Sequence, residues 1–453
     1  MRSVVAAAIV ALGLSAGAAC AEELGQRVQS PLPAMSANPD WTGIYAGAQL
    51  GMESHSANYH IVGIPILAIP DAYTRIGNVS RFAGGVFVGY NYQLPGPFVV
   101  GIEGSRTFIG GAFQLNGPNI DFLQKVQHVD TFAGRFGVLV TPTTMTYGKF
   151  GVSQIKLTGV NNGLTGQRFE KNLNGTTYGV GIESMVTENL LVRLEADRTR
   201  ANDELIVNLG FDRYRPEIIQ VMAGAAVKFN PGPPGAQTKL SWLPSLPAIT
   251  RSWTSVYVGA DIGKAGGLVD PNQLNGQLGP FSDTRTSHSF FAGGDLQLPA
   301  FLQVGPTVVV GAQYSKSWMK LGFDDPVGNG GIVTNTFRFA SISNITAITG
   351  RVGVLATPST LVYGRAGPAR IDFTASPVYF NVVNPNSLAG RSKLNASQVG
   401  GGVETFVTDH VALRVEGLFT KANEDVVLNG IAPGDTRLRA TVTTGTVGLL
   451  AKF

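Results

Sequence analysis

The residues best suited to chemistry are five histidines and one cysteine, and their spacing matches no known catalytic or metal-binding pattern. The histidines are His55, His60, His128, His288 and His410. No Ser/His/Asp set recurs in the sequence, and neither an H-E-x-x-H motif nor a Gly-rich phosphate loop is present. His55 and His60 supply only two candidate ligands, fewer than a zinc site needs, so solvated loop histidines are the favoured interpretation. We therefore expect no enzyme, no metal and no cofactor.

Charged residues that alternate with glycine form a second chemically capable set. The stretch 134–151 holds two alternating segments joined by a Thr-Pro turn, and it recurs at 350–367. Because successive side chains of a strand point to opposite faces, Arg135 and Lys149 lie among small residues on one face, while Phe136 and its alternate neighbours form an apolar face. An apolar face opposite a charged, small-residue face favours a barrel with lipid outside and a narrow polar interior.

Extending this alternation predicts a set of charges inside the barrel. An eight-stranded barrel is just wide enough to be filled by side chains, and buried charges must be paired. We therefore favour a salt-bridged plug over an ion pathway. The second copy has Ala312 or Gln313 where the first has Glu103, so its interior is expected to be net basic unless Asp295 or a loop acid turns inward. The expected interior charges are Glu103, Arg135, Lys149, Glu183, Arg193, Glu195, Asp197, Lys228, Asp261, Arg351, Arg365, Glu404, Arg414, Glu416 and Lys452.

An ordered series of matching motifs indicates that a whole domain is duplicated, since a repeat of about 190 to 200 residues is too long for a solenoid unit. The matches pair 41–48 with 253–260, 82–85 with 291–294, 99–101 with 309–311, 134–151 with 350–367, 181–188 with 402–409, 193–195 with 414–416, and Lys228-Phe229 with Lys452-Phe453. The expected domains are a first barrel over 41–229 and a second over 253–453.

Eight strands are expected in the first copy, joined by alternating short turns and long loops. The strands are expected at 42–52, 80–92, 97–109, 126–141, 144–158, 174–187, 190–203 and 216–229, with long loops at 53–79, 110–125, 159–173 and 204–215. Short turns at one end and long loops at the other are typical of an eight-stranded outer-membrane barrel with both termini in the periplasm. Aromatic residues near the turn end are expected to form a membrane girdle: Trp41, Tyr90, Tyr92, Phe229, Trp253 and Phe453.

The flanking segments indicate export. Residues 1–21 have the positive start, apolar core and small-residue cleavage site of a signal peptide, and removal of Cys20 would leave no thiol. The alternative is a lipoprotein signal with Cys20 acylated. Residues 22–40 are expected to be a periplasmic lead-in, and the Pro-rich 230–252 a semi-extended linker. That linker could join two separate barrels or form one long turn within a single sixteen-stranded barrel. The net charge of +4, carried by scattered basic residues, gives no nucleic-acid signal.

These features together resemble the small outer-membrane β-barrel surface proteins of Gram-negative bacteria. The carriers of the resemblance are the signal peptide, the motif at 41–47, the hairpin start at 134–137 and the terminal Phe453. The similarity is to the alphaproteobacterial surface antigens, related in architecture to the membrane domain of OmpA, here in tandem. It implies outer-membrane lipid and the barrel-assembly machinery as partners, with Phe453 as an assembly signal. It carries over no catalytic residues.

We expect a structural or surface-interaction protein of two tandem eight-stranded barrels. Its long loops are the expected contact surface, and the expected partners there are host or envelope surface molecules. The apolar segment 61–70 either folds over the barrel mouth or neighbouring barrel, which we favour, or presents an exposed patch to a partner. The alternative function is a porin that passes small solutes. An enzyme is the third and least favoured class.

Overall fold

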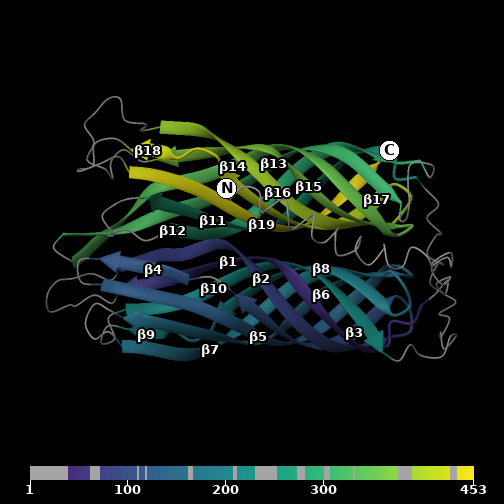
Figure 1. Ribbon diagram of the computed structural model, residues 1–453, viewed down its shortest axis with the longest axis horizontal. Coiled ribbons are helices and arrows are strands. Elements are labelled where there is room, and N and C mark those ends of the chain that lie inside the picture. The colour runs from purple at the N-terminus through teal and green to yellow at the C-terminus, as the bar shows by residue number, and fades with distance from the viewer. Residues whose placement is uncertain are drawn as a thin grey trace, which may run out of the picture.

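The protein, seen in a computed structural model, folds into antiparallel β-strands (Figure 1). The structure describes residues 39–61, 72–109, 112–117, 120–161, 167–207, 212–229, 252–272, 281–299, 307–329, 332–375, 390–428 and 436–453. The predicted signal peptide with Cys20, nearly all of the predicted lead-in and linker, and most of the apolar segment 61–70 lie outside these ranges. Among the described residues, no helix is long and apolar enough to cross a membrane.

The first half closes into a ring of eight long strands. Each strand pairs with the next along the chain, and β1 pairs with both β2 and β10, so the ring has no free edge. The short strands β4 (Ala112–Gly117) and β9 (Leu205–Val207) pair with β5 and β10 at one end of the ring. The long strands are β1 (Gly43–Ile61), β2 (Ala72–Gln93), β3 (Phe98–Ile109), β5 (Ile120–Thr141), β6 (Thr144–Asn161), β7 (Gln167–Met185), β8 (Leu190–Ala201) and β10 (Asp212–Phe229).

The second half repeats the ring, with β11 paired to both β12 and β19 and the short β18 (Val426–Leu428) paired to β19. Its long strands are β11 (Ser255–Asn272), β12 (Phe281–Gln297), β13 (Val308–Asn329), β14 (Ile332–Thr357), β15 (Thr360–Ala375), β16 (Gly390–Phe406), β17 (Val411–Ala422) and β19 (Thr436–Lys452). Each half therefore closes on itself. This confirms two eight-stranded barrels, and the single sixteen-stranded barrel is wrong.

The strands run further than the sequence pattern predicted at the end away from the short turns. The turns lie at 94–97, 142–143 and 186–189, and the third begins two residues before the predicted 188–189. At the opposite end, β1 continues to Ile61 and β7 begins at Gln167, inside the segments predicted as the loops 53–79 and 159–173. The four long loops were thus predicted too long. We call the two ends of each barrel the turn end and the loop end.

The lipid-facing alternation that marks a membrane strand ends before the strand does, because on β6 the apolar face changes sides along the strand. Near the turn end Phe150 is 67% exposed on the outer face, and Lys149 is buried inside. Closer to the loop end Ile155 and Leu157 are buried inside, while Lys156 on the outer face pairs with Glu170, Nζ to Oε1 at 2.6 Å. The strand is therefore patterned for lipid in one half and for water in the other.

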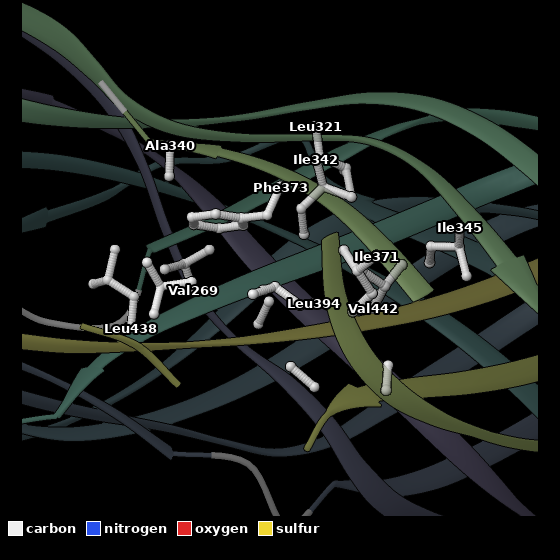
Figure 2. Packing of buried hydrophobic residues seen from close by; sticks show 14 of the residues in the cluster. Val269, Leu321, Ala340, Ile342, Ile345, Ile371, Phe373, Leu394, Leu438 and Val442 are labelled. Atoms are coloured by element: carbon white, nitrogen blue, oxygen red, sulfur yellow. The ribbon is translucent and has the colours of Figure 1, made fainter. Parts of the chain in front are cut away.

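The loop-end interior of the second barrel is correspondingly apolar, contrary to the expectation of a polar interior throughout. Figure 2 shows Phe373 of β15, Leu394 of β16 and Val442 of β19 meeting in one buried cluster. This packing holds together the parts of the strands that extend past the outward apolar band. Fully buried side chains of this kind each contribute about 1.5–3 kcal/mol to stability.

The two barrels lie side by side with their turn ends at the same end of the molecule (Figure 1). Ile182, Leu194 and Val221 of the first barrel pack in one buried cluster with Val403 and Val415 of the second. Ile182 and Leu194 belong to the apolar face expected to contact lipid, and here the second barrel covers them instead. An apolar outward side chain looks the same in the sequence whether it contacts lipid or another barrel.

The predicted aromatic girdle is wrong for the two tryptophans. Trp41 is 1% exposed and donates its indole N–H to the carbonyl of Pro142 at 3.1 Å, and Trp253 makes the same bond to Pro358. Each tryptophan thus closes the turn end of its barrel, anchored on the Thr-Pro turn. Tyr90, Tyr92, Phe229 and Phe453 are exposed, as a girdle requires.

Candidate functional site

The candidate site is the interior of each barrel, which is filled in three layers. At the turn end of the first barrel, Trp41, Tyr45, Met145 and Tyr147 belong to one apolar and aromatic cluster. At the loop end a second cluster includes Ile155. Along β6, the interior residues Tyr147, Lys149 and Ile155 follow one another from the turn end toward the loop end. The charged residues therefore occupy the layer between the two clusters.

Arg135 of β5 holds the centre of the charged layer in the first barrel. Its Nη2 lies 2.9 Å from Glu183 Oε2, and its Nη1 lies 3.2 Å from Glu103 Oε2 and donates to the hydroxyl of Tyr45. The guanidinium carbon also lies 3.9 Å from the ring centroid of Tyr147. A planar cation on an aromatic face and between two carboxylates is held in a single position.

Lys149 and Arg193 complete the network. Lys149 Nζ lies 2.6 Å from Glu195 Oε1 and 2.8 Å from Asp197 Oδ2. Arg193 Nη1 lies 2.6 Å from Glu103 Oε2, and its Nη2 donates to Gln49 Oε1 at 2.5 Å. All of these side chains are buried.

Glycine makes room for this layer where strands face large interior side chains. A Cβ atom on Gly181 would lie 2.4 Å from Tyr147 Cζ, too close for any real contact. The hydroxyl of Tyr147 donates to Glu195 Oε2 at 2.7 Å. The alternation of glycine with charge along β7 therefore reflects the packing of a narrow interior.

The second barrel repeats the layer with equivalent residues. Arg351 Nη2 lies 3.1 Å from Glu404 Oε2, and its guanidinium carbon lies 4.1 Å from the ring centroid of Tyr363. Arg365 Nη2 lies 3.1 Å from Glu416 Oε1. Tyr363 donates its hydroxyl to Glu416 Oε2 at 2.7 Å, as Tyr147 does to Glu195.

One acid and one amide exchange places between the barrels. In the first, Arg193 binds Glu103 and Gln49. In the second, the equivalent Arg414 donates to Gln313 Oε1 at 2.9 Å and to Asp261 Oδ2 at 2.7 Å. The arginine thus keeps one carboxylate and one amide in both barrels. The acid missing at the position of Glu103, on β13, is replaced by Asp261 on β11, two strands away in the sheet.

Asp295 supplies the remaining acid of the second barrel. It is 6% exposed, and its carboxylate lies 2.9 Å from Lys452 Nζ and 3.3 Å from Arg351 Nε. With Asp261, Glu404 and Glu416 it gives the charged layer four acids, against four bases: Arg351, Arg365, Arg414 and Lys452. This layer of the second barrel is therefore balanced in charge, because Asp295 turns inward.

The first barrel differs at this point. Tyr45 pairs with Gly89 and Tyr257 with Gly293, so Asn91 occupies the position of Asp295. This register also shows that the sequence match of 82–85 with 291–294 is wrong, and that Phe87 is the counterpart of Phe291. With an amide at position 91, Lys228 donates instead to the main-chain carbonyl of Asp40 at the turn end.

Replacement of Asp295 by asparagine is expected to destabilise the second barrel by about 2 kcal/mol, because hydrogen bonds to charged groups contribute about that much. Lys452 would keep its contact with Glu404 Oε1 at 2.7 Å, which limits the loss. The measurement is the urea midpoint of the protein in lipid vesicles. Asn91→Asp is the matched variant in the first barrel, where an added acid should draw Lys228 inward. An unchanged midpoint for Asp295→Asn would contradict the assigned pairing.

All fifteen charges predicted to face the interior are buried in the structure, between 0% and 7% exposed. Fourteen make ion pairs or hydrogen bonds in the charged layers, and Lys228 lies at the turn end. Phe453 is 63% exposed at the end of β19, and its role as an assembly signal stays a prediction. Four tyrosines that hold the network together were not predicted from the sequence: Tyr45, Tyr147, Tyr257 and Tyr363. Tyr45 and Tyr257 occupy the same position in the matched motif at the start of each copy, and this recurrence could have indicated their role.

The histidines lie apart from one another. His55 is buried in β1, with Nδ1 3.7 Å from Glu53 Oε2, and was wrongly placed in a loop. His128 packs edge-on to Phe108, and His288 stacks on Trp318. Among the residues described by the structure, no three His, Cys, Asp or Glu side chains group as metal ligands.

Comparison with known proteins agrees with this architecture. Residues 6–226 match the family "Outer membrane protein beta-barrel domain". The 25 kDa outer-membrane immunogenic protein of Brucella canis is 28% identical over 207 residues, which cover 45% of this chain and 86% of that protein. The protein of the same name from Brucella abortus is 29% identical over 198 residues, covering 43% of this chain and 82% of the relative.

Two solved structures are similar at lower identity. Ail, the attachment invasion locus protein of Yersinia pestis, is 14% identical with a TM-score of 0.26, covering 42% of this chain and 99% of Ail. The Pseudomonas putida toluene transporter TodX is 11% identical with a TM-score of 0.27, covering 91% of this chain and 90% of TodX. The family match spans the first barrel, the Brucella relatives each span less than half of the chain, and both halves close into rings of strands that turn apolar side chains outward, so the chain has the architecture of tandem outer-membrane β-barrels.

Proposed function

We propose that the protein is a pair of closed barrels that serves a structural and surface-interaction role in the outer membrane, without enzymatic activity. The observation that supports this most directly is the charged layer across each interior. In each barrel the layer is built from paired side chains and lies between an aromatic layer and an apolar layer. A diffusion channel needs a continuous aqueous path, and a salt-bridged layer of this kind fills the width of an eight-stranded barrel.

The contact surface in this proposal is the loop end, which faces the outside of the cell in outer-membrane barrels. The strands continue past the outward apolar band there, so the loop end of each barrel extends beyond the membrane surface. Lys156 with Glu170 and Arg198 with Glu217 are ion pairs of this outer region, with shortest N to O distances of 2.6 and 2.7 Å. A polar, water-patterned extension suits contact with host or envelope surface molecules. The barrel-assembly machinery and membrane lipid are the other partners proposed.

Planar-bilayer recording tests whether the barrels are closed. The full chain is expected to give no stable conductance steps, because the charged layer blocks both interiors. The double variant Arg135→Ala and Arg351→Ala removes the central cation of each layer and is the positive comparison. Large, stable channels from the unaltered protein would support the porin function and overturn the proposal.

A further inference from the structure

The outer faces of the two barrels differ at the loop-end margin of the apolar band. On β13 the outward residues change from Tyr314, which is 44% exposed, to Lys316 and then Trp318. On β14 the change is from Ile348, 61% exposed, to Thr346. This margin is the level of the lipid headgroups, because a bilayer's apolar band ends where polar outward side chains begin.

Three outward residues at this level form one row across neighbouring strands. Lys316 of β13 pairs with Thr346 of β14, which pairs with Arg370 of β15. Directly opposed residues on adjacent strands have Cβ atoms about 5 Å apart. The two cations therefore flank the threonine hydroxyl, and both can reach a group placed over it.

The first barrel carries the same row with its charge cancelled. There Arg106 pairs with Asp130, which pairs with Gln154. Arg106 binds both carboxylate oxygens, Nε to Oδ1 at 2.6 Å and Nη2 to Oδ2 at 2.8 Å. Thr346 stands where Asp130 would be, so Lys316 and Arg370 have no acid partner among the described residues.

The surroundings of the row also suit a lipid headgroup. Trp318 is 36% exposed, its ring lies 5.5 Å from Lys316 Nζ, and it stacks on His288 with centroids 5.7 Å apart. Tryptophan is enriched at membrane–water interfaces. Asp372 is the next outward residue of β15 and lies closer to the loop end than the row. It pairs with Asn344 of β14 and Lys393 of β16.

We propose that the row Lys316, Thr346 and Arg370 binds the phosphate group of a lipid in the outer leaflet. Arginine and lysine both bind phosphate, through a planar fork and a point charge respectively, and the threonine hydroxyl donates a third hydrogen bond. The source is a lipid because Tyr314 and Ile348 lie immediately below, where they contact its acyl chains. This site is independent of whether the barrel interiors are closed.

Native mass spectrometry of the full chain in detergent, titrated with diphosphoryl lipid A, tests the proposal. One tightly bound lipid per chain is expected. Thr346→Asp recreates the neutral row of the first barrel and should lower the affinity about tenfold, the effect of losing about 1.4 kcal/mol. Thr346→Asn is the control of similar size without charge and should retain binding. Heat-dependent electrophoretic mobility checks that each variant is folded.

The first barrel allows the reverse experiment. Asp130→Thr with Gln154→Arg transfers the row to that barrel and should create a second lipid site of similar affinity. The proposal is overturned if Lys316→Ala and Thr346→Asp both bind lipid as the unaltered chain does. It is also overturned if inorganic phosphate at equal concentration displaces the lipid, because the site would then be one for a free anion.

Discussion

Replacing Arg135 with methionine is expected to destabilise the first barrel by about 4 kcal/mol, the cost of removing one partner from a buried ion pair. Arg135 pairs with Glu183, and removal of its guanidinium leaves that carboxylate buried without a cation beside it. Glu103 is less affected, since Arg193 Nη1 remains 2.6 Å from Glu103 Oε2. Urea unfolding in lipid vesicles, followed by electrophoretic mobility, measures the loss.

The second barrel provides a matched comparison. Arg351→Met removes the equivalent cation, but Glu404 keeps Lys452 at 2.7 Å, so the loss should be smaller than for Arg135→Met. Adding Glu183→Gln to Arg135→Met should recover much of the lost stability, because the unpaired buried carboxylate is then removed. Equal losses in the two barrels, or no recovery in the double variant, would show that Glu183 does not depend on Arg135.

The part of the fold that the sequence predicted well is the part where one physical rule acts alone. Between the short turns and the membrane margin, lipid outside and a narrow interior require apolar residues to alternate with small or charged ones. The positions of Arg135, Lys149 and Glu183 follow from that rule, and all three are buried. The tight turns could also be located, because Thr-Pro and similar pairs mark them locally.

The remaining features depend on partners that a single strand does not reveal. The loop-end parts of the strands, such as 167–173 of β7, were assigned to loops because they are polar, and the lipid-facing alternation has already inverted by Ile155 and Lys156 of β6. The pairing of Asp295 depends on the register of β12 against β11, which simple motif matching placed wrongly. The burial of Ile182 depends on the neighbouring barrel. In each case the deciding contact comes from another strand.

The contact between the barrels has approximate two-fold symmetry. Thr144 and Thr360, equivalent residues after the two Thr-Pro turns, share a hydrogen bond of 2.8 Å between their hydroxyls. Near the loop end, Ser56 of β1 contacts Thr284 of β12, with hydroxyl oxygens 3.3 Å apart. The buried cluster of the seam contains equivalent residues of both barrels, Ile182 with Val403 and Leu194 with Val415, as a two-fold dimer interface does. The duplicated chain therefore resembles a dimer joined by a linker.

The symmetry is broken at one point, where Val221 fits a notch in the second barrel. A Cβ atom on Gly417 would lie 2.3 Å from Val221 Cγ1, and one on Gly445 would lie 2.7 Å from Val221 Cγ2. Gly445→Val is therefore expected to force the barrels apart, because overpacking a close contact costs about 1–3 kcal/mol. That cost corresponds to an association about 5- to 150-fold weaker.

A protease site inserted between residues 230 and 252 makes this loss measurable. After cleavage, the two folded halves of the unaltered chain should co-migrate in native electrophoresis, and those of Gly445→Val should separate. The equivalent residues of Gly417 and Gly445 in the first barrel are Ala196 and Val221. Exchanging all four, with Ala196→Gly, Val221→Gly, Gly417→Ala and Gly445→Val, moves the valine to the second barrel and the notch to the first. Association should then return. Separation of the unaltered halves, or failure of the exchange to restore association, would mean that the linker and not the seam holds the barrels together.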